Sequence, residues 1–151
     1  MKKFLVLNGA NLNMLGIREP DIYGKNTYKD LIKMLKSYAK ARKIKIVFCQ
    51  SNHEGTLIDE IQRAYFMNFD GIVFNPGGYT HTSISLADAI KAVQIPTAEV
   101  HISDVSARED FRKISYIRPV CAVTIAGQGF AGYKKALDFL TDYIEKQRRE
   151  E

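Results

Sequence analysis

Short apolar runs alternate along the chain with longer segments in which hydrophobic residues recur at helical spacing. Five runs have the length of buried strands, and they cover residues 3–8, 44–49, 71–74, 96–102 and 120–126. Apolar positions three or four apart predict helices over residues 28–39, 57–65, 86–93 and 133–144, with a further short helix around 108–113. Thr27 and Asp30 form a capping-box pattern at the start of the first of these helices. The alternation is typical of βαβ units, whose parallel strands are covered by helices on both faces.

Five strands linked by such units predict a flavodoxin-like, doubly wound α/β fold with the parallel strand order 2-1-3-4-5. The chain has 151 residues, close to the usual size of one domain, so we expect a single catalytic domain over residues 1–151. With 46% hydrophobic and 26% charged residues the composition is that of an ordinary globular protein.

Composition also narrows the classes of function. The net charge of +5 favours an anionic partner only weakly, because the charges at residues 146–151 are of mixed sign, and no basic stripe or nucleic-acid-binding module is present. No apolar stretch has the length of a membrane span or of a signal-peptide core, so we expect a cytoplasmic protein that binds neither nucleic acid nor membrane. Cys49 and Cys121 form no metal-ligand pattern and are interpreted as small buried hydrophobic residues.

Polar residues gather where the predicted strands end. They are Asn8, Asn11 and Asn13 after the first strand, Gln50 and Asn52 after the second, Asn75 and Gly77 after the third, and His101 and Ser103 at the end of the fourth. Each Asn alone is typical of a turn. Because ligands of open α/β sheets bind outside the carboxyl ends of the strands, the whole set predicts a site at that edge.

Two familiar site types do not fit the pattern. Gly127, Gly129 and Gly132 match a dinucleotide fingerprint, but no second strand follows them, so we interpret them as a tight turn with close packing of the last helix. A phosphoacceptor domain of the same fold class needs acidic residues at the ends of strands 1 and 3, where this chain has Asn8 and Asn75.

The histidines and one long loop supply the remaining candidates. His53, His81 and His101 lie in separate segments without metal-ligand spacing, so we expect no metal. His53 is interpreted as a surface or capping residue, His81 as either a capping or a ligand-contacting residue, and His101 as a residue that faces the ligand or lies buried beside Glu99. The charged loop over residues 14–26 is typical of a mobile lid that closes over an anionic ligand, and of a solvated surface loop when taken alone.

Several motifs together resemble the type II 3-dehydroquinate dehydratases. The resemblance rests on the segments 8–16, 18–20, 22–24, 50–55, 75–83, 99–103 and 107–112, in the expected order and spacing over nearly the whole chain. It implies loss of water from 3-dehydroquinate to give 3-dehydroshikimate, with no cofactor, in the shikimate pathway of aromatic amino acid biosynthesis or in the catabolic quinate pathway. It also implies a homo-oligomer of trimers built into a dodecamer.

The resemblance assigns roles residue by residue. Tyr23 resembles the base and His101 the general acid, Glu99 orients His101, and Asn11 holds a water or the enolate oxygen. The substrate-binding set is Asn75, His81 and Arg112 for hydroxyl groups, Ile102 and Ser103 for the carboxylate, and Asp88 for the site of a neighbouring subunit. A phenol with a pKa of about 10 must lose about 3 units to act near neutral pH, at a cost of ~4 kcal/mol. One guanidinium at ~4 Å supplies roughly that much, and either Arg18 or Arg108 is a candidate.

Two readings outside this family stay open from the sequence. One is a non-catalytic, flavodoxin-like binding module for an anionic metabolite. The other is a phosphate- or flavin-dependent protein built on the C-terminal glycines. Only the dehydratase forms an enone from 3-dehydroquinate, so turnover separates it from both alternatives.

Overall fold

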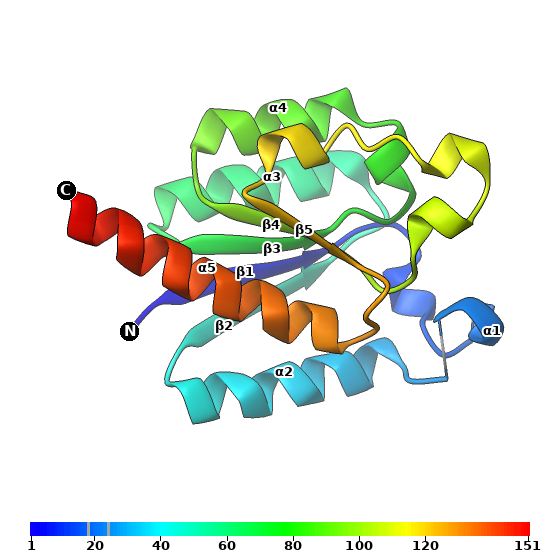
Figure 1. Cartoon of the computed structure of the whole chain (residues 1–151), viewed down its shortest axis with the longest axis horizontal. Helices are drawn as coiled ribbons and strands as arrows, with labels where there is room; N and C mark the ends of the chain where they lie inside the picture. Colours follow the sequence, from blue (N-terminus) through cyan, green and yellow to red (C-terminus); the bar gives the residue numbers. More distant parts are fainter. Residues whose placement is uncertain (18, 24) are drawn as a thin grey trace.

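Five parallel strands form one twisted sheet in the order β2-β1-β3-β4-β5, which confirms the predicted topology (Figure 1). The computed structural model describes residues 1–17, 19–23 and 25–151, and of residues 22 and 23 it describes only the backbone. The strands are β1 (Lys3–Asn8), β2 (Lys45–Gln50), β3 (Gly71–Asn75), β4 (Thr97–His101) and β5 (Val123–Ala126). Strand β1 pairs with both β2 and β3, so the end of β1 lies between two neighbours that end level with it.

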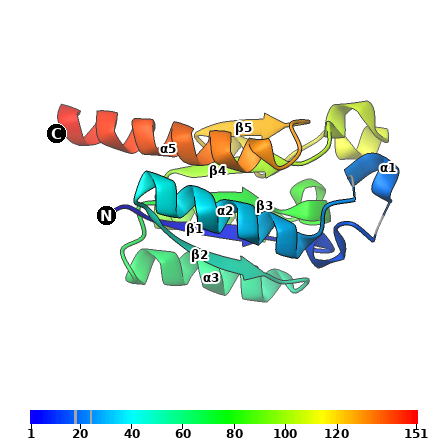
Figure 2. The same cartoon turned by 90° about the horizontal axis from the view of Figure 1, so that it is seen from below.

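Four long helices cover the two faces of the sheet. Helices α3 (Glu54–Phe66) and α4 (Ile84–Val93) lie on one face, and α2 (Tyr28–Arg42) and α5 (Ala131–Glu150) lie on the other (Figures 1 and 2). Successive strand residues point to opposite faces, so Phe4 and Val6 pack under α2 and α5 while Leu5 and Leu7 pack under α3 and α4. Each half of the core is therefore built by the alternation along the buried strands.

Local signals start the helices where the sequence predicts them. Thr27 and Asp30 form both hydrogen bonds of a capping box at the start of α2. The Ser83 hydroxyl accepts a hydrogen bond from the Leu86 N–H at the start of α4. His53 stands at the N-cap position of α3, is exposed, and makes no side-chain capping bond, which leaves it as a surface residue.

Three expectations differ from the structure in detail. The fifth strand begins at Val123 instead of residue 120, because Arg118–Val120 forms a 3₁₀ turn around Pro119, which has no N–H for a ladder. The connection over residues 9–26 contains a 3₁₀ turn (Leu12–Met14) and a short helix α1 (Pro20–Tyr23). Cys49 and Cys121 are half-buried and not fully buried.

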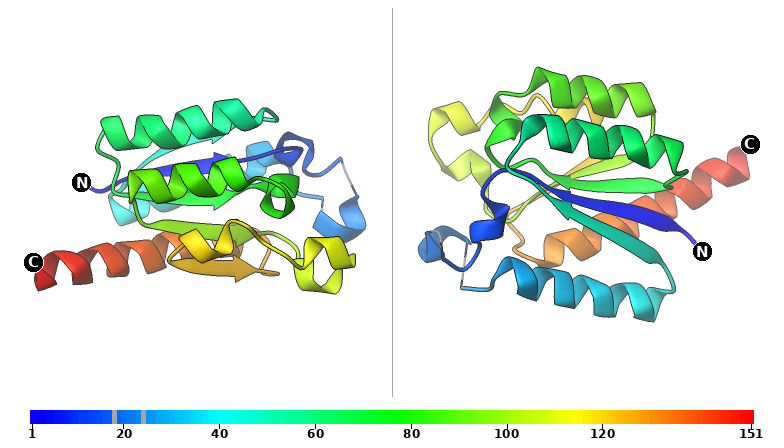
Figure 3. Two further views of the ribbon diagram at one scale, coloured as in Figure 1. Left: turned by 90° about the horizontal axis from the view of Figure 1, so that it is seen from above. Right: turned by 180° about the vertical axis from the view of Figure 1, so that it is seen from behind.

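The connections that leave the carboxyl ends of the strands gather at one end of the molecule, and both chain ends lie at the other (Figures 1 and 3). Short 3₁₀ turns at Gly77–His81, Val105–Ala107 and Asp110–Arg112 belong to this group of connections. None of the described helices combines the length and the apolar character needed to cross a membrane.

Candidate active site

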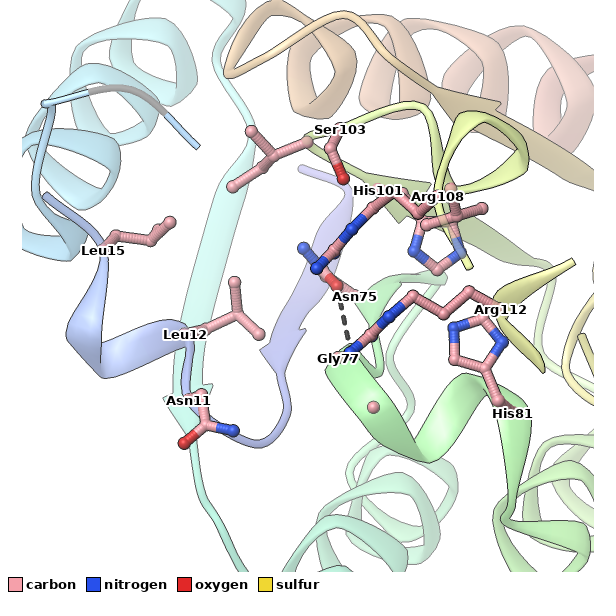
Figure 4. Close-up of a pocket in the computed structure, with 13 residues that line it drawn as sticks. Asn11, Leu12, Leu15, Asn75, Gly77, His81, His101, Ser103, Arg108 and Arg112 are labelled. Atoms are coloured by element: carbon pink, nitrogen blue, oxygen red, sulfur yellow. Dashed lines mark hydrogen bonds between the residues drawn. The ribbon is translucent and has the colours of Figure 1, made fainter. Parts of the chain in front are cut away.

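A cavity of about 130 Å³ opens at the carboxyl ends of β1, β3 and β4 (Figure 4). Its walls are made by the segments that follow these three strands. The residues lining it are Asn11, Leu12, Leu15, Asn75, Gly77, Gly78, His81, His101, Ile102, Ser103, Val105, Arg108 and Arg112. The edge where the sequence collects polar residues is therefore a real cavity, with apolar Leu12, Leu15 and Val105 on part of its wall.

Glu99 and His101 form the buried pair beside this cavity. They are two residues apart on β4 and so point to the same face, where His101 Nε2 lies 2.7 Å from Glu99 Oε2. Hydroxyl groups from elsewhere in the chain complete the surroundings of the carboxylate: Ser115 Oγ donates to Oε2 and Thr124 Oγ1 donates to Oε1, each at 2.8 Å. The Arg118 guanidinium adds a cation at 4.0 Å from Oε1.

These contacts fix the charge of Glu99. Its burial alone raises the pKa of the carboxyl group, but the hydrogen bonds from His101, Ser115 and Thr124 more than offset this, and the pKa lies below its usual value. The Ser115 hydroxyl accepts from the backbone N–H groups of Ile117 and Arg118, so its own proton is directed to Glu99. A carboxylate can only accept, so the bonded nitrogen of His101, Nε2, carries a proton.

His81 lines the cavity beside Arg112 and is oriented by the backbone (Figure 4). Its Nδ1 lies 2.7 Å from the Ile114 carbonyl oxygen and therefore carries the proton, which leaves Nε2 as the acceptor nitrogen. Burial is the main cause that lowers the pKa of His81, and the nearby His101 and Arg112 lower it further. His81 is thus a neutral lining residue, and the start of α4 is capped by Ser83 instead.

Two guanidinium groups extend into the cavity, those of Arg108 and Arg112 (Figure 4). Arg112 Nε donates to Glu109 Oε2 at 2.7 Å, and Arg108 lies 3.7 Å from Glu19 and 3.9 Å from Glu109. Glu109 and Glu19 are exposed, so solvent weakens their attraction for the arginines, and two cations remain close to any ligand in the cavity. The charge of this wall suits an anionic ligand.

Asn75 is held at both ends of its side-chain amide. Its Oδ1 accepts from the Gly77 N–H at 3.1 Å, and its Nδ2 donates to the Tyr133 hydroxyl at 3.0 Å. Tyr133 comes from α5 and in turn donates to Asn8 Oδ1 at 2.5 Å. The amide at the end of β3 is therefore ordered by a helix from the far end of the sequence.

The loop after β1 packs directly against the loop after β3. A Cβ atom added to Gly77 would lie 2.5 Å from the Ala10 carbonyl oxygen, and one added to Gly9 would lie 2.2 Å from the Pro76 carbonyl oxygen. Asn11 adopts a left-handed conformation with φ of 71°, and its N–H donates to Asn52 Oδ1 at 2.9 Å. The position of Asn11 is therefore set by the end of β2 as well as by its own loop.

The glycine cluster after β5 supports the end of β4. Gly127 and Gly129 have φ of 75° and 57°, which confirms the predicted tight turn. The Gly127 N–H donates to the Ser103 carbonyl oxygen and the Gly129 N–H donates to that of Ile102, both at 3.1 Å. These glycines fix the backbone of Ile102 and Ser103, which line the cavity.

The structure brings together most of the predicted site. Asn11, Asn75, His81, His101, Ile102, Ser103, Arg108 and Arg112 line the cavity, and Glu99 stands behind His101. Asp88 is exposed on α4 and is absent from the described lining of its own chain's cavity. Arg18 and Gly24 lie outside the described residues, and so does the side chain of Tyr23, whose backbone ends α1.

Some participants carried no recognisable signal in the sequence. Ser115 and Thr124 lie 16 and 25 positions from Glu99, and no local pattern joins them to it. The apolar residues Leu12 and Leu15 stand in a polar segment, and for Tyr133 the apolar spacing predicts only a place in the last helix. Across residues 1–17, 19–23 and 25–151, no three His, Cys, Asp or Glu side chains come together as ligands for a metal ion.

Comparison with known proteins gives a consistent set of relatives. A family model described as "Dehydroquinase class II" matches residues 2–141. A 3-dehydroquinate dehydratase of Fusobacterium nucleatum is 53% identical over 146 residues, which are 95% of this chain and 99% of the relative. One of Caldicellulosiruptor bescii is 52% identical and covers 96% of this chain and 100% of the relative. The crystal structure of a type II dehydroquinase from Butyrivibrio crossotus has a TM-score of 0.92 at 52% identity, over 93% of this chain and 97% of that one.

Proposed function

Because this chain belongs to the class II dehydroquinase family, we propose that it is a hydro-lyase that converts 3-dehydroquinate into 3-dehydroshikimate and water. The observation that carries the proposal is the Glu99–His101 pair, buried beside a cavity that also contains the cations of Arg108 and Arg112. The substrate is a polyhydroxylated carboxylate, so an anionic group and several hydroxyls must be bound in one small space.

The reaction needs three groups. A base removes the proton next to the ketone, and the electrons of that C–H bond move to form an enolate. Donors then stabilise the enolate oxygen. The ketone re-forms as the neighbouring C–O bond breaks, and an acid protonates the departing hydroxyl to give water.

His101 is the acid in this scheme. Its Nε2–H is held by Glu99, so Nδ1 is the atom that transfers a proton to the departing hydroxyl. The carboxylate of Glu99 stays ionised through the hydrogen bonds of Ser115 and Thr124, and it stabilises the protonated imidazole before transfer. Glu99 therefore positions the acid and supplies its counter-charge.

Tyr23 is the base, and the loop over residues 14–26 is the lid that brings it to the cavity. The phenol needs a nearby cation to ionise close to neutral pH, a role for Arg18 on the same loop or for Arg108 on the cavity wall. Asn11, at the start of the same connection between β1 and α2, holds a water molecule or the enolate oxygen itself.

The remaining lining residues bind the substrate. Asn75, His81 and Arg112 contact its hydroxyl groups, and the backbone N–H groups of Ile102 and Ser103 with the Ser103 hydroxyl contact its carboxylate. Asp88 contributes to the site of a neighbouring subunit in a homododecamer of trimers, since it lies exposed on α4, away from its own cavity. The enzyme acts in the cytoplasm, in the shikimate pathway.

The decisive experiment follows the ultraviolet absorbance of the enone product when purified protein is mixed with 3-dehydroquinate. Turnover supports the dehydratase, whereas stoichiometric binding without product supports a non-catalytic binding module. Tyr23→Phe and His101→Ala should each lower kcat by about 10²- to 10⁴-fold while leaving the fold intact. His53→Ala is the matched control, because His53 is exposed and makes no capping bond. Near-normal turnover in Tyr23→Phe or in His101→Ala would remove that residue from its proposed role.

The cation beside Tyr23 can be identified from the pH profile. Arg18→Ala should raise the pKa that governs the basic role of the phenol, because the ionised phenol loses its nearest counter-charge. The measurement is kcat as a function of pH for the wild type and for this variant. An unchanged profile would assign the role to Arg108 instead.

A further inference from the structure

Tyr133 is a buried tyrosine on α5 whose hydroxyl contacts the ends of two central strands, β1 and β3. Its side chain is 0% exposed and is among the largest fully buried ones in the described structure. It projects from the first turns of α5, and its hydroxyl oxygen lies 2.5 Å from Asn8 Oδ1 and 3.0 Å from Asn75 Nδ2. Asn8 and Asn75 are paired residues at the ends of β1 and β3.

The protons of this group can be assigned from its chemistry. The amide oxygen of Asn8 can only accept, so the single proton of the Tyr133 hydroxyl is donated to it. The tyrosine oxygen is then an acceptor for Asn75 Nδ2. Because the Gly77 N–H needs an acceptor at the other end of the amide, a flipped Asn75 would lose both partners. The orientation of the amide is therefore set by Tyr133 on one side and Gly77 on the other.

This orientation determines what Asn75 offers to the cavity. Of its two amide protons one is bound to Tyr133, and of the two lone pairs on Oδ1 one is bound to the Gly77 N–H. One N–H and one lone pair are left, in known places, for a ligand in the cavity that Asn75 lines. Such a pair can donate to one hydroxyl group and accept from another.

A purely structural reading explains the group less well. A buried phenylalanine beside an apolar strand residue would pack at this position without the cost of burying polar atoms. Asn8 also lies near the Tyr28 hydroxyl, yet its Nδ2 makes no hydrogen bond of ordinary geometry with any group that the structure describes. The buried polar atoms therefore destabilise the core, and what they provide in return is a fixed orientation of the Asn75 amide.

We propose that Tyr133, anchored by Asn8, is a positioning residue that orients the Asn75 amide toward the hydroxyl groups of the substrate. This inference rests on the proposed dehydratase function for the identity of the ligand. The orientation itself depends only on the contacts of the chain. Tyr133 acts through Asn75 and lies outside the cavity lining, so its effect falls on binding more than on the chemical step.

Tyr133→Phe tests the proposal, with Tyr38→Phe as the matched control. Tyr38 packs against the same half of the core and its hydroxyl is bonded to Asp138, but it is far from the cavity lining. In Tyr133→Phe we expect KM for 3-dehydroquinate and the Kd of the product to rise on the order of tenfold, with kcat within about threefold of the wild type. Tyr38→Phe should leave all three values unchanged.

The side-chain amide of Asn75 gives a readout that does not depend on turnover. Its two proton signals, assigned in ¹⁵N-labelled protein by their loss in Asn75→Ala, should be well separated in the wild type. Both chemical shifts should move toward those of a solvated Asn side chain in Tyr133→Phe, because Nδ2 loses its acceptor. If that variant does not fold, Asn8→Ala takes its place, with an expected rise in KM of about threefold.

The results separate cleanly. A raised KM and shifted Asn75 amide signals in Tyr133→Phe, beside unchanged values in Tyr38→Phe, support the proposal. An unchanged KM in Tyr133→Phe, or an equal rise of KM in Tyr38→Phe, overturns it. If the wild type does not turn over 3-dehydroquinate, the proposed function fails, and unaltered Asn75 signals in the Tyr133 variant would still overturn the positioning role.

Discussion

Replacing Thr124 by Val tests how the buried charge of Glu99 is maintained. Thr124 pairs with Glu99 across the β4–β5 ladder, and its hydroxyl donates to Glu99 Oε1 at 2.8 Å. Valine keeps the shape of the side chain and removes the donor. A hydrogen bond to a charged group is worth about 1.5–3 kcal/mol, and the extra methyl group returns at most ~0.8 kcal/mol. We therefore expect Thr124→Val to lower the free energy of unfolding by about 1–2 kcal/mol at neutral pH.

The pH dependence of this loss has a definite sign. The folded-state pKa of Glu99 is lowered from the ordinary value of 4.5, so its contribution to stability is present above pH 4.5 and is lost as the pH falls through the folded-state pKa. Thr124 supplies part of that contribution. Once Glu99 is protonated in the folded state, the missing bond is an ordinary neutral one worth about 1 kcal/mol or less. The difference between wild type and variant should therefore narrow as the pH drops below 4.5.

Urea unfolding at neutral pH and at several acidic pH values measures this difference by linear extrapolation. Thr141→Val is the matched control, because Thr141 is also partly buried and donates to an uncharged acceptor, the Leu137 carbonyl oxygen, at 2.8 Å. That variant should change stability by less than about 0.5 kcal/mol at every pH. An equal loss in the two variants, or a Thr124 effect independent of pH, would refute the reasoning.

Three further predictions concern the glycine contact, a thiol and a histidine. Gly77→Ala should lower the free energy of unfolding by more than about 2 kcal/mol, because φ is +63° and the new Cβ would lie 2.5 Å from the Ala10 carbonyl oxygen. Gly78→Ala should leave stability unchanged, because nothing lies within 4 Å of its added Cβ. Equal melting temperatures of the two variants would contradict this. Burial raises the pKa of Cys121 to about 12, so in a Cys49→Ser background its alkylation should be about 40-fold slower in the folded than in the urea-unfolded protein, and comparable rates would count against it. Burial lowers the pKa of His81 from 6.5, so folding stability should decrease as the pH falls below 6.5, and His81→Asn should remove part of that slope in urea titrations; an identical slope would rule it out.

The spacing of apolar residues, the helix-capping residues and the turn glycines predict much of the fold. The strand order, the capping box at Thr27 and the turn at Gly127 all follow from short-range signals that the structure retains. The start of β5 does not, because Val120 is apolar for a different reason: it packs against the α3–α4 side of the core from a turn instead of from the ladder. An apolar run reports burial, and it does not distinguish the two kinds of backbone.

The residues of the candidate site likewise fall into those that the sequence predicts and those that it does not. His101 and Asn75 could be found because each stands at a strand end, where the topology gives the location, and Glu99 because it lies two positions before His101 on the same face of β4. Ser115 and Tyr133 could not, because their importance depends on which distant atoms their hydroxyls reach. The role proposed for Asp88 involves a second subunit, and no periodicity within one chain describes that.

The close contact between the loops after β1 and β3 has a practical consequence for engineering. The backbone of Gly9 lies against Pro76 and that of Gly77 against Ala10, so neither loop can move without displacing the other. A graft that exchanges only one of them for the loop of a relative would disturb Asn11 and Asn75 together. Attempts to change the substrate range by loop exchange should therefore transfer residues 9–12 and 75–78 as a single cassette.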